Sequence, residues 1–152
     1  MNAPKWLVIA SIVNLAGNAI GIVLALQNNL MSDLGGSIQG QDVHRDFLTT
    51  RGTALSAPVP FMLIQLVLTL LVLRSGRWRL TGSAGLTFFG MLYTLAQAGE
   101  RITLRLLTPA GFDSVQALAL VVNEASAIAM LVLGILAWKS LRAPRRVVTE
   151  SP

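Results

Sequence analysis

A single carboxyl side chain lies deep within an apolar stretch near the C-terminal end of the chain. The stretch runs from Val115 to Trp138, and Glu124 is ten residues past Ser114, which immediately precedes it. If the stretch is an α-helix across a membrane, its rise places Glu124 ~15 Å below the boundary, near the middle of a ~30 Å hydrocarbon core. Ionisable residues at that depth are costly, and they are functional candidates by default.

No basic residue is expected at the depth of Glu124, because Arg101 falls at the outer end of the preceding apolar stretch. A desolvated carboxyl without a counter-charge is expected to be protonated. It can then donate a hydrogen bond, act as a general acid or exchange a proton, which makes Glu124 the candidate catalytic residue. A purely structural role, hydrogen bonding between helices, has equal weight.

The same arithmetic places polar side chains from the other apolar stretches near this level. We expect a central polar layer that binds a ligand through Asn14, Asn18, Gln65, Tyr93, Thr94, Gln97, Asn123 and Glu124. Thr94 and Gln97 belong to a stripe of small and polar residues spaced by three and four, which predicts either a helix–helix seam or a pocket wall. Gly17 and Gly21 form a small-xxx-small pattern that predicts close contact with a neighbouring helix.

Four apolar stretches must carry these side chains, at about 6–27, 56–73, 80–98 and 115–138. Each is close to the ~20 residues that a helix needs to cross the bilayer. The composition agrees, since 53% of the 152 residues are hydrophobic and 12% are charged, against roughly 25% charged in soluble domains. The sequence therefore predicts an all-α, polytopic membrane protein built as a four-helix transmembrane bundle.

The distribution of charge predicts the orientation of these helices. The N-terminus, the turn at 74–79 and the C-terminal tail contain eight of the 12 Lys and Arg residues, and the two other loops contain four. By the positive-inside rule, both ends are cytoplasmic. Much of the formal charge of +5 is then explained by topology, and no nucleic-acid partner is expected. The predicted location is the cell membrane.

The predicted domain organisation is a single transmembrane domain at 1–142 followed by a disordered basic cytoplasmic tail at 143–152. A cleaved signal peptide is the alternative for the first stretch, but it is longer than the usual 7–15-residue apolar core of such peptides, so a retained helix is favoured. In the loop at 28–53, a short interfacial helix is expected with Val43, Phe47 and Leu48 towards lipid.

Few classes of chemistry remain open. The chain contains no Cys and one His, which excludes thiol catalysis and iron–sulfur clusters. Asp42, His44 and Asp46 are expected to form a solvated charged loop, so no metal is predicted. No cofactor is indicated, and whether the protein is an enzyme stays open. The favoured function is binding, with transformation as an extension, of a small lipophilic molecule. The alternatives are an oligomeric proton-coupled transporter and an accessory subunit of a membrane complex.

Overall fold

The computed structural model describes residues 2–36, 38–49, 51–106 and 108–142, and the tail predicted at 143–152 lies outside the described residues. Most of the described chain is helical, which confirms the all-α prediction. The elements are α1 (Ala3–Asn28), β1 (Asp33–Leu34), β2 (Ile38–Gln39), α2 (Val43–Leu48), α3 (Val59–Leu73), α4 (Arg77–Gly99), α5 (Arg101–Leu106), the 3-10 turn η1 (Pro109–Gly111) and α6 (Ser114–Arg142).

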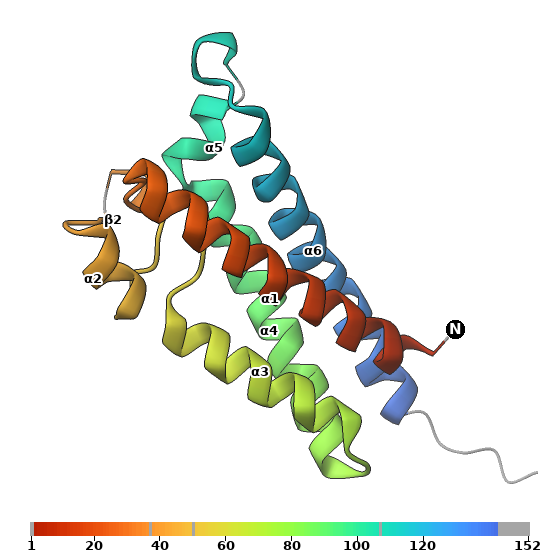
Figure 1. Cartoon of the computed structure of the whole chain (residues 1–152). Helices are drawn as coiled ribbons and strands as arrows, with labels where there is room; N and C mark the ends of the chain where they lie inside the picture. The colour runs from red at the N-terminus through yellow and green to blue at the C-terminus, as the bar shows by residue number, and fades with distance from the viewer. Residues whose placement is uncertain (1, 37, 50, 107, 143–152) are drawn as a thin grey trace, which may run out of the picture.

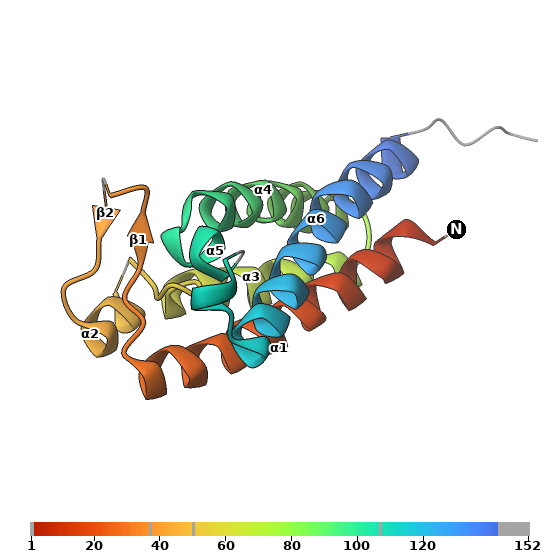
Figure 2. The same cartoon turned by 90° about the horizontal axis from the view of Figure 1, so that it is seen from above.

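The long helices lie side by side. Helix α6 packs against both α1 and α4, and α3 packs against α4 and α1. The N-terminal end of α1, the α3–α4 turn and the C-terminal end of α6 gather at one end of the molecule, and α2, β1 and β2 lie at the other (Figure 1 and Figure 2). The segment that joins α1 to α3, here called the α1–α3 connection, therefore sits over one end of the helices.

Local sequence determines where these helices begin. The Asp113 carboxylate accepts hydrogen bonds from the backbone N–H groups of Val115 (3.0 Å) and Gln116 (2.9 Å), and it thereby caps the beginning of α6. Helix α3 begins at Val59, three residues later than predicted, because the residue before it, Pro58, has an extended backbone. The Ser56 hydroxyl donates to the Ala57 carbonyl at 3.0 Å and does not cap the helix.

Glycines allow close contact between helices. A Cβ atom at Gly17 would overlap the Asn123 side chain on α6, so the predicted contact of Gly17 with a neighbouring helix is confirmed. A Cβ atom at Gly90 would overlap the backbone of α6 at Ala127, which assigns this part of the predicted α4 stripe to a helix seam. Gly21 lies against the Leu55 carbonyl of the α1–α3 connection instead of a helix.

The helices bury polar side chains and expose apolar ones. On α1, Asn14 and Asn18 are buried, whereas Ile12 and Ile20 are 55% and 56% exposed. By length and composition, α1 and α6 are able to cross a membrane, and α3 is apolar but has only 15 residues. In α2, which forms where the short helix was predicted, Val43 is buried against the protein and Leu48 is exposed.

Candidate functional site

Asn14 is the centre of a buried polar network between α1, α3 and α6. Its amide nitrogen donates to the Asn123 carbonyl (3.2 Å) and to the Ser126 hydroxyl (3.0 Å) on α6. Its amide oxygen accepts from the amide of Asn18 (3.1 Å), one turn further along α1, and from that of Gln65 on α3 (3.2 Å). Both donor positions and both acceptor positions of the Asn14 amide are therefore used within the protein.

A closed ring of hydrogen bonds joins α1 to α3 beside Asn14. The side-chain amide of Gln65 donates to the Ser11 hydroxyl (3.1 Å), and the Ser11 hydroxyl bonds the Thr69 hydroxyl (2.7 Å). The Thr69 hydroxyl donates back to the backbone carbonyl of Gln65 (2.8 Å). All three residues are almost completely buried. Because each hydroxyl both donates and accepts, the bonds of such a ring polarise one another and strengthen the contact.

Amide side chains also support a buried segment without helical structure just before α3. Asn123 donates to the Leu55 carbonyl (2.9 Å), and the Ala57 N–H donates to the Asn18 amide oxygen (2.7 Å). Leu55 is fully buried. Backbone groups in such a place need partners from the protein, and Asn18 and Asn123 provide them.

A cavity of about 180 Å³ lies where α1, α3 and α4 meet the α1–α3 connection. Five of the eight predicted ligand-binding residues line it, namely Asn14, Asn18, Tyr93, Gln97 and Asn123. Gln65 does not line the cavity but is bonded to Asn14 behind its wall. Apolar side chains, including Phe61 and Leu92, complete the lining. The cavity thus has both a hydrogen-bonding and an apolar wall.

Two residues that line this cavity, Tyr93 and Asn123, carry a buried polar atom without a hydrogen-bond partner within the described residues, and the Tyr93 hydroxyl is the one that can donate. The Tyr93 side chain is buried. The ring makes an edge contact with Phe89, with centroids 5.4 Å apart, and Phe89 makes a similar contact with Phe61 at 5.9 Å. These contacts hold the ring in place, so the hydroxyl is positioned and available.

Glu100 ties the rim of the cavity to the end of α4. Its carboxylate accepts hydrogen bonds from the Ser32 hydroxyl (2.5 Å) and from the Asp33 N–H (2.8 Å). Burial raises the pKa of Glu100, and the neighbouring Asp33 charge adds to this, although the two hydrogen bonds oppose it. Asp33 is itself paired with Arg101 at 3.3 Å. The α1–α3 connection is therefore fastened to the α4–α5 junction by polar contacts.

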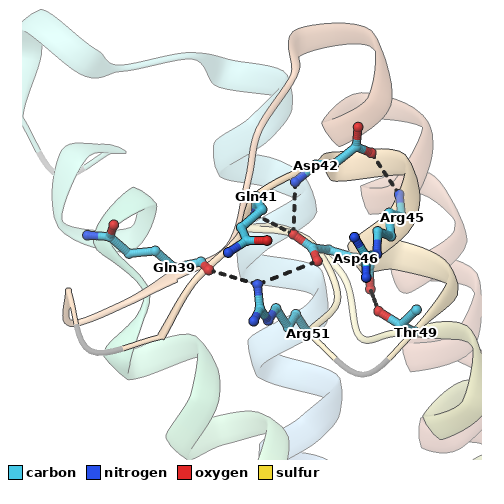
Figure 3. Close-up of polar contacts among 7 residues, drawn as sticks. All are labelled: Gln39, Gln41, Asp42, Arg45, Asp46, Thr49 and Arg51. Carbon is cyan, nitrogen blue, oxygen red and sulfur yellow. Dashed lines mark hydrogen bonds and ion pairs between the residues drawn. The ribbon is translucent and has the colours of Figure 1, made fainter.

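Asp46 organises the part of the connection that carries Arg51, another residue of the rim (Figure 3). Its carboxylate accepts from the N–H groups of Gln41 (2.6 Å) and Asp42 (3.2 Å) and pairs with Arg51 at 3.9 Å. Burial alone would raise the Asp46 pKa, but these hydrogen bonds and the charges of Arg51 and Arg45 together hold it below its usual value. Asp46 is thus a buried structural residue, whereas a solvated one was expected.

Glu124 lies apart from the network and from the cavity. It lines a separate depression of about 390 Å³, here called the Glu124 groove, together with Gln97 and Thr103 and with apolar residues that include Val121, which is 61% exposed. One carboxyl oxygen of Glu124 is buried and has no hydrogen-bond partner within the described residues, and the same holds for the Thr94 hydroxyl. The structure therefore does not bring Glu124 and Asn14 together.

Several polar residues of the site were not selected from the sequence, among them Ser11, Thr69 and Glu100. Ser11 precedes Asn14 by three residues, and Thr69 follows Gln65 by four, so both lie on the helix faces of residues that were selected. This spacing could have identified them. Glu100 follows the third apolar stretch by two residues, but its partners are Asp33 of β1 and Ser32 immediately before it, and the sequence analysis did not predict that strand.

Comparisons with known protein families, curated proteins and solved structures find no match to this chain. The fold and the site described above are therefore the basis for proposing a function. They define an all-α protein with an internal amide network, a cavity beside it and a free tyrosine hydroxyl in that cavity.

Proposed function

We propose that the chain crosses the membrane four times through α1, α3, α4 and α6, with both ends cytoplasmic, and that its cavity binds a small lipophilic molecule. The inverted burial pattern supports the membrane part, since a surface of exposed Ile, Val and Leu surrounds buried Asn, Gln and Ser. In water that arrangement would leave apolar surface exposed and lose the free energy of burying it. In lipid the apolar surface meets hydrocarbon, and the polar groups are satisfied within the protein.

The short helix α3 fits the same environment. Non-helical backbone is tolerated at membrane depth where it is buried in protein or lines a cavity. The segment before α3 meets both conditions, because Leu55 is fully buried while Ala54 and Ala57 line the cavity. The hydrogen bonds to the Leu55 carbonyl and the Ala57 N–H replace the water that lipid cannot supply.

The Tyr93 hydroxyl is the observation that carries the ligand proposal. A buried hydroxyl without a partner costs free energy, and a ligand with a hydrogen-bonding group would remove that cost. The volume of about 180 Å³ is below the ~300–1,000 Å³ of pockets for drug-sized molecules. The ligand is accordingly a small apolar molecule, of the size of one ring with a short substituent, with one polar group for Tyr93.

Solvent extraction of the purified protein, followed by mass spectrometry, tests this proposal. We expect a small lipophilic molecule to co-purify with the wild type. Ala96→Trp, which fills the cavity, should abolish its retention, and Tyr93→Phe should weaken it about 3–10-fold, the value of one hydrogen bond. Leu95→Trp is the matched control, because Leu95 is the neighbouring residue on α4 and is 65% exposed. A wild-type protein without a co-purifying molecule, or equal retention by Ala96→Trp, would overturn the proposal.

Reporter fusions test the topology separately. A fusion after Arg142 should report the cytoplasmic side, and an insertion at Gly35, in the α1–α3 connection, should report the opposite side. The fusion point and the insertion point both lie outside the helices. Equal signals from the two sites would contradict the proposed number of crossings without bearing on the cavity.

A second candidate function, an accessory subunit, is favoured by the Glu124 groove. A carboxyl with an unpartnered buried oxygen is expensive in a membrane, and a transmembrane helix from a partner would cover the apolar residues of the groove around it. The chain contains no Cys, so Val121→Cys provides a clean cross-linking site beside Glu124. A specific cross-linked product in membranes, absent for Ile12→Cys on the exposed face of α1, would support this function. If both cysteine variants are labelled equally by a thiol reagent but neither gives a cross-linked product, the accessory-subunit function is excluded.

A further inference from the structure

An apolar groove lies at the opposite end of the molecule from the cavity. It has a volume of about 500 Å³ and is lined by Thr87 on α4 and by Ile135, Trp138, Lys139 and Arg142 on α6. We call it the C-terminal groove. The four α6 residues are spaced by three, one and three, so they form one face of the helix.

The packing of α6 leaves this face open. Gly134 lies against the Thr87 side chain and brings α6 close to α4 at that level. Beyond it, Ala137 is fully buried in the hydrophobic core that also contains Leu7 of α1. The C-terminal end of α6 continues to the end of the molecule at which α1 begins (Figure 1 and Figure 2).

The floor of the C-terminal groove is apolar and its mouth is cationic. The Thr87 hydroxyl donates to the Ser83 carbonyl at 2.7 Å, so it is already satisfied. At the mouth, the Arg142 guanidinium lies over the Trp138 ring, 4.5 Å from its centroid, and Lys139 is exposed. Both ion pairs within the described residues involve other groups, at the opposite end of the molecule. Lys139 and Arg142 are therefore available to an anion.

We propose that the C-terminal groove is a binding site for an anionic phospholipid. One acyl chain lies along Thr87 and Ile135, and the phosphate is held between Lys139 and Arg142, at the level where the Trp138 indole meets the membrane surface. Charge decides the occupant, because two exposed cations on one helix face at the mouth of an apolar groove complement a phosphate group joined to an acyl chain. The site depends on the proposed membrane embedding but not on the cavity or on Glu124.

Binding of phosphatidylglycerol, relative to phosphatidylcholine with the same acyl chains, tests the site. The protein is purified in detergent, and lipid retention is measured by native mass spectrometry. A basic residue near an anionic lipid contributes roughly a fivefold change in affinity. Lys139→Gln/Arg142→Gln should therefore weaken phosphatidylglycerol binding by about 25-fold and leave phosphatidylcholine binding unchanged.

Two further variants separate a site from general attraction to a basic surface. Arg74→Gln/Arg77→Gln removes the same charge from the α3–α4 turn, at the same end of the molecule, and should retain the preference for phosphatidylglycerol. Ile135→Trp fills the groove while keeping both cations, and it should lose that preference. Equal losses from both charge variants, or full binding by Ile135→Trp, would overturn the proposal. Competition by soluble glycerol phosphate would also overturn it, since no acyl chain would then be needed.

Discussion

Replacing Asn14 by alanine should destabilise the packing of α1 against both α3 and α6. The substitution removes a side chain that makes four hydrogen bonds in the buried network. The backbone is unaffected, because alanine is a good helix former. The change therefore isolates the contribution of the amide to the contact between the helices.

The magnitude follows from which bonds are lost and which groups keep a partner. Three of the four bonds cross between helices, to Asn123, Ser126 and Gln65. At about 0.6 kcal/mol for an average interhelical hydrogen bond in a membrane, they amount to about 2 kcal/mol. The cost is limited because Ser126 still donates to the Asn123 carbonyl (2.9 Å) and Gln65 keeps its bond to Ser11. The alanine side chain also leaves a cavity that corresponds to part of the volume of the lost amide, and this cavity adds to the destabilisation.

Reversible unfolding in mixed micelles, followed by circular dichroism, measures this difference. Asn28→Ala is the control, because the Asn28 amide donates only to the Leu24 carbonyl of its own helix, at an exposed position. We expect about 2 kcal/mol for Asn14→Ala and less than about 0.5 kcal/mol for the control. If the two variants lose the same stability, Asn14 does not join the helices and the network has no role in the fold.

Three other changes test separate parts of the structure. Gly17→Leu should destabilise by roughly 1–3 kcal/mol through overpacking against α6, whereas Ala19→Leu on the exposed face of α1 should be neutral, as measured by the same unfolding assay. Because burial raises the Glu100 pKa, the stability that protonation provides is complete below its ordinary pKa of about 4.5 and is lost as the pH rises through the folded value; melting temperatures above pH 4.5 should fall with pH in the wild type and less so in Glu100→Gln. Asp46→Ala should cost about 1–3 kcal/mol by leaving the backbone N–H groups of Gln41 and Asp42 without their acceptor, with faster hydrogen exchange at Gln41 and Asp42; because the Asp46 pKa is lowered, the contribution of the carboxylate is present at neutral pH and disappears only as the pH falls through that low value.

The positions of the long helices could be predicted from the sequence because apolar stretches of this length have few alternatives. The predicted 6–27 and 115–138 lie within α1 and α6. The short elements were harder to predict. Helix α5 and the strands β1 and β2 depend on contacts between distant segments, such as the Glu100 carboxylate with Ser32. Such contacts leave no periodic signal in a single sequence.

Depth along a helix could be predicted for the candidate site, but direction around the helix axis was not resolved. Counting residues placed the polar side chains near one level, and five of them do line a single cavity. The count gives no information about which face of the helix points inwards. Asn123 and Glu124 are neighbours at the same depth, yet roughly 100° separates successive side chains on an α-helix. Only one of the two can point directly at α1.

The choice between Asn123 and Glu124 follows from the small residues of α6. Its buried positions include Ala119, Asn123, Ser126, Met130 and Gly134, spaced by three or four. Asn123 belongs to this series and Glu124 does not, so the packing of α6 on α1 and α4 directs the amide inwards. The energetic reason is the same one that led to Glu124 as a candidate. A neutral amide is less costly to bury than a carboxylate, which needs a cation or a proton, and the Asn123 amide donates to the Leu55 carbonyl although its oxygen has no partner within the described residues. The packing of α1 against α3 and α6 therefore uses neutral side chains, and the carboxyl of Glu124 lies at the separate groove.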